Sequence, residues 1–382
     1  MTLFFLYLIA AVCLCVLYAC VILFLWRGLL RLKPGANTRN HSFSIVIAAR
    51  NEEAILGACL DTVLDQDYPR DLFEVIVVDD RSTDATAAIV RQRAAVQTNI
   101  TLVSITECPT GVSPKKNALT HGIAAAKGEI ILFTDADCLV SNTWVSHINA
   151  HFSPTVGAVS GLTTYYSDPS LNRLFWGVQA ADFFSHGVVS AAAMGAGVPL
   201  NTNANNFAVR KSVFDQIGGY GKVRHVVSGD DDLLLQAIAR SGNWQVTYAP
   251  EQGAAVTTRP TQTLRGVWEQ RKRWGSKTVF YNVAQRALLS GIFMFYCLIF
   301  AGFLALPFGT GPWVLLVACV FTVKTGLDLF LAKAGMRLFG NDALWSFFLV
   351  LAFIHVPLIV LAALFGIFGR FTWKDAQSRR VA

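Results

Sequence analysis

Charged residues are missing from the first part of this sequence, and their absence is the first guide to its class. No Asp, Glu, Lys or Arg occurs from Leu3 to Trp26, a run long enough for one spanning helix. Hydrophobic residues make up 53% of the chain and the mean hydropathy is +0.45, above the range of an ordinary soluble globule. A fully soluble protein is therefore excluded, and we expect residues 1–27 to form a transmembrane anchor.

The same segment lacks the features of a cleaved signal peptide. No basic residue precedes the apolar run, and the run exceeds a typical signal core. Cys20 follows a faint lipoprotein-type cleavage pattern, but the bulky Tyr18 argues against cleavage. Arg27, Arg31 and Lys33 come directly after the run, so the positive-inside rule predicts that the chain enters the cytoplasm there.

Cysteine spacing of the metal-binding or disulfide type is also missing. The cysteines outside the first apolar run are scattered along the chain: Cys59, Cys108, Cys138, Cys297 and Cys319. They indicate neither a zinc site nor a disulfide framework, and a reduced cytoplasmic domain fits them. The formal net charge of +7 would suit nucleic acid, but many basic residues flank apolar segments, where anionic lipid headgroups explain them. We predict membrane lipids, and no nucleic acid, as partners.

Alternating strand and helix patterns occupy the segment after the anchor. Strands are predicted at 43–48, 74–78, 100–104 and 130–134. Helices are predicted up to Leu64, from a cap at Ser82-Thr83-Asp84 to Arg93, and over 115–126. This alternation predicts an α/β fold with a mostly parallel, doubly wound sheet. From 157 to 250 the alternation of strands and helices becomes less regular. We expect this second half of the domain to hold a second substrate, the acceptor of a transferred group.

Three further apolar runs follow, at about 288–308, 313–332 and 343–369. If all three crossed the membrane, the basic tail from Arg370 to Arg380 would lie outside, against the positive-inside rule. We therefore expect two to three spans plus an interfacial helix. Pro357 interrupts the last run, which makes it one candidate for a segment that does not cross.

Two opposite charges lie inside the second of these runs. Lys324 and Asp328 are four residues apart and share one helix face. The functional interpretation is a contact with a lipid headgroup or acceptor. We favour an internal ion pair that hides both charges from lipid.

Acids end two of the predicted strands. Asp79 and Asp80 follow EVIVV, and Asp135 and Asp137 follow IILFT, where open α/β sheets bind their ligands. Residues two apart in an extended segment point to one face, so Asp135 and Asp137 are expected to converge. Such a pair suits Mg²⁺ or Mn²⁺ holding a diphosphate. For Asp79 and Asp80 a helix cap or solvated turn is the structural alternative.

Further charged residues lie at predicted helix starts. Lys115 is placed to meet a diphosphate beside backbone N–H groups, or to be a solvated helix-end lysine. Asp230, Asp231 and Asp232 precede the pattern LLLQAIA. Helix capping explains acids there, but three adjacent like charges repel, and a raised proton affinity would suit a general base.

The segment QRKRW covers Gln270 to Trp274 in a predicted amphipathic helix. A basic helix lying on the membrane surface is the structural interpretation. Gln270 and Arg273 share a face with Trp274 nearby. Arg273 would neutralise a departing diphosphate, and Trp274 would offer a ring to a sugar.

The chain contains, in order, SIVIAARNEEAILGACLDTVLDQDYP, EVIVVDDRSTDAT, KKNALTHGIAAAKGEIILFTDADC, NNFAVRKSVFDQIGGY, SGDDDLL and QRKRW. Together, over about residues 43–280, they resemble the membrane-anchored family-2 glycosyltransferases, which include processive polysaccharide synthases and ceramide glucosyltransferases. The resemblance implies the Rossmann-like GT-A fold, which binds a nucleotide-diphospho-sugar, and transfer with inversion at the anomeric centre.

The resemblance also implies roles for single residues. Asp79 and Asp80 match the nucleotide-binding acids, and Lys115 matches a lysine near the nucleotide. Asp135 and Asp137 match the metal-binding DxD.

The family's Gly-Glu-Asp reads Gly229-Asp230-Asp231 here, so Asp231 inherits the role of base. The change from Glu to Asp at Asp230 leaves open which carboxylate acts. Gln270, Arg273 and Trp274 match the family's QxxRW signature.

On this basis we predict five segments: an anchor at 1–27, a basic linker at 28–42, a cytoplasmic GT-A domain at 43–280, a C-terminal membrane region at 281–370 and a basic tail at 371–382. The predicted activity is an inverting hexosyl transfer from a UDP-sugar, with Mg²⁺ or Mn²⁺, to a membrane lipid or lipid-linked glycan. The expected location is a bacterial inner membrane, with the catalytic domain in the cytoplasm.

Two alternatives remain beside lipid glycosylation. A processive synthase of a β-linked polysaccharide shares the same motifs, although such synthases usually carry more spans to line a tunnel. A non-catalytic membrane subunit that binds sugar nucleotides belongs to another class, and the complete set of acids argues against it.

Overall fold

The computed structural model describes residues 2–275, 281–368, 371–373 and 376–378. The chain forms two compact units. The sheet unit comprises residues 31–168 and 189–260, and the helical unit comprises residues 1–30, 169–188 and 261–382. Residues 276–280, at the predicted end of the GT-A domain, and half of the predicted tail at 371–382 lie outside the described residues.

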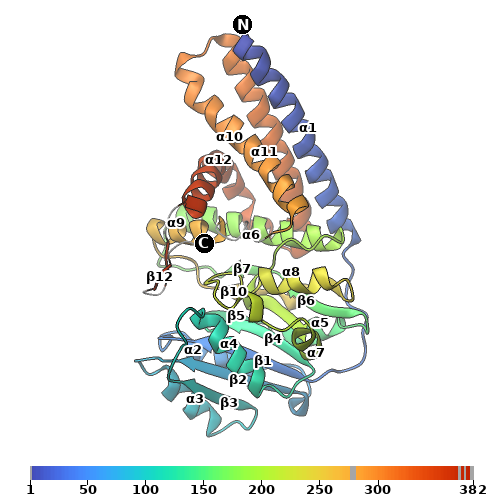
Figure 1. Cartoon of the computed structure of the whole chain (residues 1–382), viewed down its shortest axis with the longest axis vertical. Coiled ribbons are helices and arrows are strands. Elements are labelled where there is room, and N and C mark those ends of the chain that lie inside the picture. Colours follow the sequence, from blue (N-terminus) through green and yellow to red (C-terminus); the bar gives the residue numbers. More distant parts are fainter. Residues whose placement is uncertain (1, 276–280, 369–370, 374–375, 379–382) are drawn as a thin grey trace. The chain divides into compact units, whose positions relative to one another are not determined.

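The sheet unit is built on a seven-stranded sheet in the order β3-β2-β1-β4-β8-β6-β9 (Figure 1). The strands are β1 (Phe43–Ala49), β2 (Phe73–Asp80), β3 (Ile100–Ile105), β4 (Ile130–Asp135), β6 (Val156–Gly161), β8 (Phe207–Arg210) and β9 (Gln245–Ala249). β8 is antiparallel to β4 and β6, and the other pairs are parallel. The predicted doubly wound, mostly parallel sheet is confirmed.

Helices and a second, small sheet complete this unit. The helices are α2 (Leu56–Leu64), α3 (Thr86–Ala94), α4 (Pro114–Ala125), α5 (Trp144–Ala150), α7 (Lys211–Gln216) and α8 (Asp232–Ser241). The small sheet contains β5 (Cys138–Val140), β10 (Val256–Thr258) and β7 (Thr163–Tyr165). The cap predicted for α3 is shifted, because Ala85 is the N-cap residue and Asp84 accepts a hydrogen bond from the Thr86 N–H at 3.0 Å.

The core of the sheet unit explains the unbroken apolar runs of its strands. Ile45 and Ile47 of β1 pack into one cluster with α2 and α5, whereas Val46 faces α4, where a Cβ on Gly122 would lie 2.5 Å from its Cγ1. Since both faces are covered, Ile45, Val46 and Ile47 are all fully buried. Each such side chain contributes about 1.5–3 kcal/mol of burial free energy.

The helical unit consists of α1 (Thr2–Arg31), part of α6 (Arg173–Gly195), α9 (Leu264–Gly275), α10 (Val283–Ala305), α11 (Gly311–Phe339) and α12 (Trp345–Phe368), with the short strands β11 (Phe371–Trp373) and β12 (Ala376–Ser378). Four helical segments in the described part of the chain are long and apolar enough to cross a membrane: Phe4–Arg31, Val283–Phe308, Gly311–Phe339 and Asp342–Gly366. They coincide with the predicted apolar runs. Pro357 lies inside α12 and does not end it.

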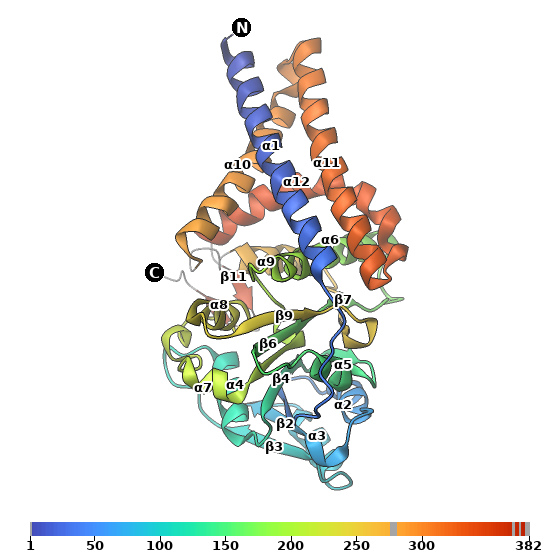
Figure 2. The same ribbon diagram turned by 90° about the vertical axis from the view of Figure 1, so that its right-hand side faces the viewer.

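Aromatic contacts pack α1 against its neighbours α10 and α11 in this unit, and the ribbons of these three helices are seen in Figure 2. Tyr18 packs on Phe295 of α10, and Trp26 packs on Phe330 of α11, at ring distances of 5.0 and 5.5 Å. The predicted internal ion pair of α11 is confirmed, with Lys324 Nζ 2.7 Å from Asp328 Oδ2. Lys324 is fully buried, so the pair keeps its ammonium away from lipid.

Candidate active site

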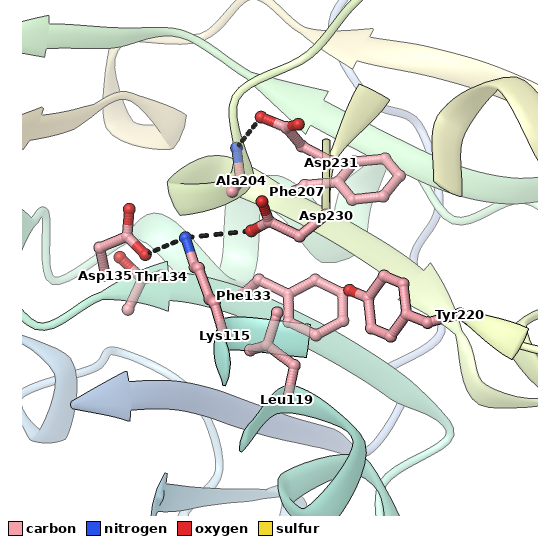
Figure 3. Close-up of a pocket in the computed structure, with 10 residues that line it drawn as sticks. All are labelled: Lys115, Leu119, Phe133, Thr134, Asp135, Ala204, Phe207, Tyr220, Asp230 and Asp231. Atoms are coloured by element: carbon pink, nitrogen blue, oxygen red, sulfur yellow. Dashed lines mark hydrogen bonds and ion pairs between the residues drawn. The ribbon is translucent and has the colours of Figure 1, made fainter. Parts of the chain in front are cut away.

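A small cavity lies at the carboxyl end of β4 (Figure 3), with an empty volume of about 230 Å³ that includes open solvent. It belongs to the sheet unit. Its lining combines apolar and charged side chains: Lys115, Leu119, Phe133, Thr134, Asp135, Ala204, Phe207, Tyr220, Asp230 and Asp231. The structure thus brings together four of the predicted site residues, Lys115, Asp135, Asp230 and Asp231, where α/β sheets bind ligands.

Lys115 links two of the acids in this cavity (Figure 3). It lies in the first turn of α4, and its Nζ is 2.7 Å from Asp135 Oδ1 and 3.0 Å from Asp230 Oδ2. Burial alone would lower the pKa of Lys115, but Asp135 and Asp230 outweigh it and hold the pKa above its usual range. Lys115 therefore keeps a positive charge between the two carboxylates, and the interpretation as a solvated helix-end lysine is wrong.

The three consecutive acids point to different partners. Asp230 binds Lys115. Asp231 is the N-cap of α8 and accepts hydrogen bonds from the Asp232 N–H at 2.7 Å and the Ala204 N–H at 3.1 Å. Asp232 accepts from the Thr202 N–H at 2.9 Å. Because an ammonium and backbone N–H groups relieve their repulsion, three adjacent carboxylates coexist here, and Asp231 is the one that is only half buried.

The loop that leads to these acids is held by a second lysine. Lys116 is 1% exposed, and its Nζ donates hydrogen bonds to the carbonyl oxygens of Val223, Val226 and Ser228 at 3.1, 2.7 and 3.0 Å. Gly229 follows with a φ of +79°, a left-handed conformation that favours glycine. The adjacent lysines of α4 thus have separate tasks, since Lys115 binds the acids and Lys116 binds the backbone before them.

The DxD segment differs from the predicted geometry. β4 ends at Asp135, and residues 136–137 form a turn before β5, so the assumption of an extended segment was wrong. The two carboxylates are nevertheless close enough to interact. Burial, with added repulsion from Asp135 and Glu52, raises the pKa of Asp137 to about 6.

The donor set around Asp135 suits a hard divalent cation. In the described ranges no three His, Cys, Asp or Glu side chains are grouped to hold a metal ion by themselves. Asp135 and Asp137 supply carboxylate oxygens, and the mutual repulsion of these acids is what a cation would relieve. Thr134 adds a buried Oγ1 which, among the residues described, has no hydrogen-bond partner. These oxygens fit Mg²⁺ or Mn²⁺ when a diphosphate and water complete the coordination.

Asp79 and Asp80, at the end of β2, are not among the residues that line the described cavity. Asp79 accepts a hydrogen bond from the Ser82 N–H at 3.1 Å. Asp80 binds Arg81 through Nε and Nη2 at 2.8 and 3.2 Å. Arg81 has a positive φ of 59°, and Asn51, which follows β1, has a positive φ of 55°. Non-glycine residues in this conformation cluster at functional sites, and these two lie in loops at the ends of β2 and β1.

The QRKRW segment lies in α9 of the helical unit. Gln270 accepts a hydrogen bond from Arg271 Nη1 at 2.7 Å. The Trp274 ring stacks on Phe183 and meets the edge of His186, while Arg273 is half buried. The Trp274 ring thus already contacts protein groups, and its role as a platform for a sugar stays a prediction.

Several residues of these sites were not predicted. Lys116 and Tyr220 belong to the quoted segments KKNAL and IGGY, but nothing in their local pattern distinguishes a buried lysine or tyrosine from a surface residue. Burial and the nearby Asp230 hold the pKa of Tyr220 well above its usual range. Arg271 and its partner Asp182 lie 89 residues apart, and one sequence offers no signal for that pairing.

Residues 40–276 match the family "Glycosyltransferase like family 2". The chain belongs to this family.

Similar proteins of known name include a probable glycosyltransferase, a glucosyldiacylglycerol synthase and a polysaccharide synthase. The probable glycosyltransferase YdaM of Bacillus subtilis is 26% identical over 83% of this chain and 74% of its own length. The beta-monoglucosyldiacylglycerol synthase of Synechocystis is 28% identical over 60% and 46%. The poly-beta-1,6-N-acetyl-D-glucosamine synthase of Staphylococcus epidermidis is 26% identical over 60% and 53%. The chain thus spans about half the length of the latter two.

Among solved structures, the mannosyltransferase PcManGT from Pyrobaculum calidifontis, in complex with GDP-Man and Mn²⁺, superposes with a TM-score of 0.61. The match covers 95% of this chain and 99% of that one at 20% sequence identity. The likeness confirms the predicted GT-A fold together with apolar helices at both ends of the chain. The protein is a membrane-associated glycosyltransferase.

Proposed function

We propose that the protein transfers a sugar, with inversion, from a UDP-sugar to a membrane-associated acceptor, most simply a lipid. The observation that carries this proposal is the cavity at the end of β4, in which Lys115 joins Asp135 to Asp230 beside the half-buried Asp231. Transfer of a sugar from a nucleotide diphosphate requires positive charge at the diphosphate, acids that bind a metal ion, and a separate carboxylate that acts as the base.

The reaction assigned to these residues is a single displacement. The acceptor hydroxyl oxygen bonds to the anomeric carbon while the bond from that carbon to the diphosphate oxygen breaks. Asp231 takes the hydroxyl proton, because Asp230 is already bound to Lys115 and Asp232 is buried. Lys115 lies where it neutralises negative charge on the leaving diphosphate.

A divalent metal bound by Asp135 and Asp137 would supply further positive charge to the diphosphate. The test is calorimetry of UDP-sugar binding with and without Mn²⁺. Binding should require Mn²⁺, and Asp137→Ala should weaken it, with Asp215→Ala on the surface of α7 as the control. Unchanged Mn²⁺-dependent binding in Asp137→Ala would remove this residue from the metal site.

Lipid is favoured as the acceptor for two reasons. One relative is named for a glucosyldiacylglycerol product, and at most three candidate spans follow the sheet unit in the described part of the chain. The relative that makes a polymer supports the alternative of a processive synthase. Few helices are available here to line a polymer tunnel, so single transfer to a lipid is the better proposal.

The deciding experiment uses the purified full chain in lipid nanodiscs with membrane extract and a panel of radiolabelled UDP-sugars, with GDP-mannose included. Label should appear in a lipid-soluble fraction from one UDP-sugar, and Asp231→Asn should abolish it. A labelled polymer would identify a processive synthase instead. Nucleotide binding without turnover for every donor would identify a non-catalytic subunit.

We also propose that the sheet unit faces the cytoplasm of a bacterial inner membrane, where nucleotide sugars are made. The basic flank after α1 supports this orientation. A cysteine placed at exposed Lys222, in a variant without the other accessible cysteines, should resist a membrane-impermeant thiol reagent in intact cells. Ready modification would reverse the topology.

A further inference from the structure

A buried ion pair joins α6 to α9 in the helical unit. Arg271 Nε donates to Asp182 Oδ2 at 2.6 Å, and Arg271 Nη2 contacts the same oxygen. Asp182 is 2% exposed and Arg271 is 4% exposed. Burial alone would raise the pKa of Asp182, but the guanidinium of Arg271 holds it below its usual range. The guanidinium thus favours the ionised form of Asp182, and the two contacts with Asp182 fix Arg271 in position.

Arg271 also contacts two neighbouring residues of the QxxRW signature, Gln270 and Trp274. Its Nη1 donates to Gln270 Oε1 at 2.7 Å, and its Cζ lies 4.2 Å from the centre of the Trp274 ring. A planar guanidinium can make an ion pair, a hydrogen bond and a ring contact at once, which an ammonium cannot. Arg271, which the QxxRW signature leaves unspecified, thus contacts two of the three residues that the signature names.

The neighbours of Asp182 on α6 hold the other side of this arrangement. Phe183 stacks on the Trp274 ring at 5.7 Å between ring centres, with 28° between the planes. His186 meets the same ring edge-on at 5.0 Å. Trp274 is therefore oriented by contacts from two helices.

The ion pair also reaches the apolar helices of the same unit. His355 of α12 places Nε2 3.8 Å from Asp182 Oδ1, and its Nδ1 lies 3.4 Å from Lys324 Nζ of α11. Asp182 thus contacts both α9 and α12, and His355 in turn contacts α11.

We propose that Asp182 and Arg271 are positioning residues that hold Gln270 and Trp274 in the orientation needed to receive the acceptor. This inference rests on the proposed glycosyl transfer. Neither residue takes part in the chemistry, and their effect reaches the reaction through the ring and the amide that they orient.

The primary variant is Arg271→Lys, which keeps a positive charge beside Asp182 but loses the planar fork. Removing the charge instead, as in Asp182→Asn, would leave a buried guanidinium unpaired and destabilise the fold. Misplacement of groups that position a substrate costs up to about 100-fold in rate. For Arg271→Lys we expect the rate of transfer to fall by about 10- to 100-fold. The fall should come from a lower kcat and a higher KM for the acceptor, while the affinity for UDP-sugar stays unchanged.

The matched control is Asp342→Asn, which removes a carboxylate from an exposed ion pair of the same unit, with Lys333. It should retain normal transfer. The proposal would be overturned if Arg271→Lys and the unaltered protein had the same kcat and the same acceptor KM.

A second measurement does not depend on activity. The full chain is labelled with 5-fluorotryptophan, and the ¹⁹F resonance of Trp274 is assigned by its loss in Trp274→Phe. This resonance should shift in Arg271→Lys and stay in place in Asp342→Asn. An unmoved resonance means that the pair does not orient the ring. If the resonance shifts in Arg271→Lys but the unaltered protein transfers no sugar, the proposed function is refuted and the structural role of the pair remains.

Discussion

The two units of this protein bury charge in different ways. In the sheet unit, Lys116 donates to three backbone carbonyl oxygens, and Asp231 and Asp232 accept from backbone N–H groups. In the helical unit, the buried charges are matched by side chains of opposite sign, Arg271 by Asp182 and Lys324 by Asp328.

The difference follows from where free backbone groups exist. The loops at residues 198–206 and 220–229 of the sheet unit leave N–H and C=O groups that are not used in a ladder, so these groups can solvate an ion. The backbone of a long apolar helix is consumed by its own hydrogen bonds. A charge inside α11 can therefore be neutralised only by another side chain. Within the proposed mechanism, Lys115 and Asp231 are the charges of the sheet unit that act in the reaction.

The largest effect is expected where a buried charge in the helical unit loses the opposite charge beside it. Asp328→Leu leaves Lys324 buried and unpaired and should destabilise the protein by about 3–5 kcal/mol. The double variant Lys324→Met/Asp328→Leu should recover most of this loss. Thermal unfolding in nanodiscs tests both. Tyr18 donates a hydrogen bond to Asp328, and Lys324 contacts His355. A double variant as unstable as the single one would show that these polar contacts, and not the charge pairing, stabilise the helices.

In the sheet unit the removal of a charge should act on the reaction more than on stability. Asp231→Asn keeps the size of the side chain but loses the proton acceptor, so transfer should fall by about 10² or more. Binding of UDP-sugar should survive. Asp230→Asn should act differently, by releasing Lys115. Near-normal transfer in Asp231→Asn, combined with loss of transfer in Asp230→Asn at full donor occupancy, would move the role of base to Asp230.

Lys116→Met tests the solvation of a charge by backbone. The change removes the ammonium that donates hydrogen bonds to the carbonyl oxygens of Val223, Val226 and Ser228. A buried polar group left without a partner lowers the free energy of unfolding by about 1–3 kcal/mol. Unfolding of the protein in nanodiscs measures the loss. Lys222→Met, at an exposed position of the same loop, is the control. An equal effect of the two variants would mean that the three carbonyl contacts of Lys116 do not stabilise the loop.

The smallest effect is expected at a hydrogen-bonded carboxylate of the sheet unit, Glu251. Glu251 binds His151 at 2.9 Å and the Gly35 N–H at 2.8 Å. Burial opposes ionisation of Glu251, but these hydrogen bonds hold its pKa below the usual value. Its contribution to stability is thus present above the unfolded pKa and lost as the pH falls through the folded one.

The measurement for this pair is the stability of Glu251→Gln against the unaltered protein from pH 7 down to acid. The difference should be largest near neutral pH and shrink as Glu251 becomes protonated. A difference that is constant with pH would assign the effect to packing of the side chain.

The predicted strands at 43–48, 74–78, 100–104 and 130–134 agree with β1 to β4 within two residues at each end. They were predictable because helices cover both faces of the sheet, which leaves continuous apolar runs. The turn at residues 136–137 was missed, since IILFTDADC reads as an extended segment until the position of β5 is known. The acids and Lys115 were recognised from their place after strands and at a helix start.

The amino-acid sequence alone determined the apolar helices, the parallel sheet and the family, because each depends on local periodicity or on an ordered set of short motifs. The tertiary structure decided which groups meet. It showed that Asp230 shares Lys115 with Asp135, and that Arg271, 89 residues away in the chain, is the partner of Asp182. Such pairings depend on how loops and helices distant in sequence are packed together, and no local pattern in one sequence carries that information.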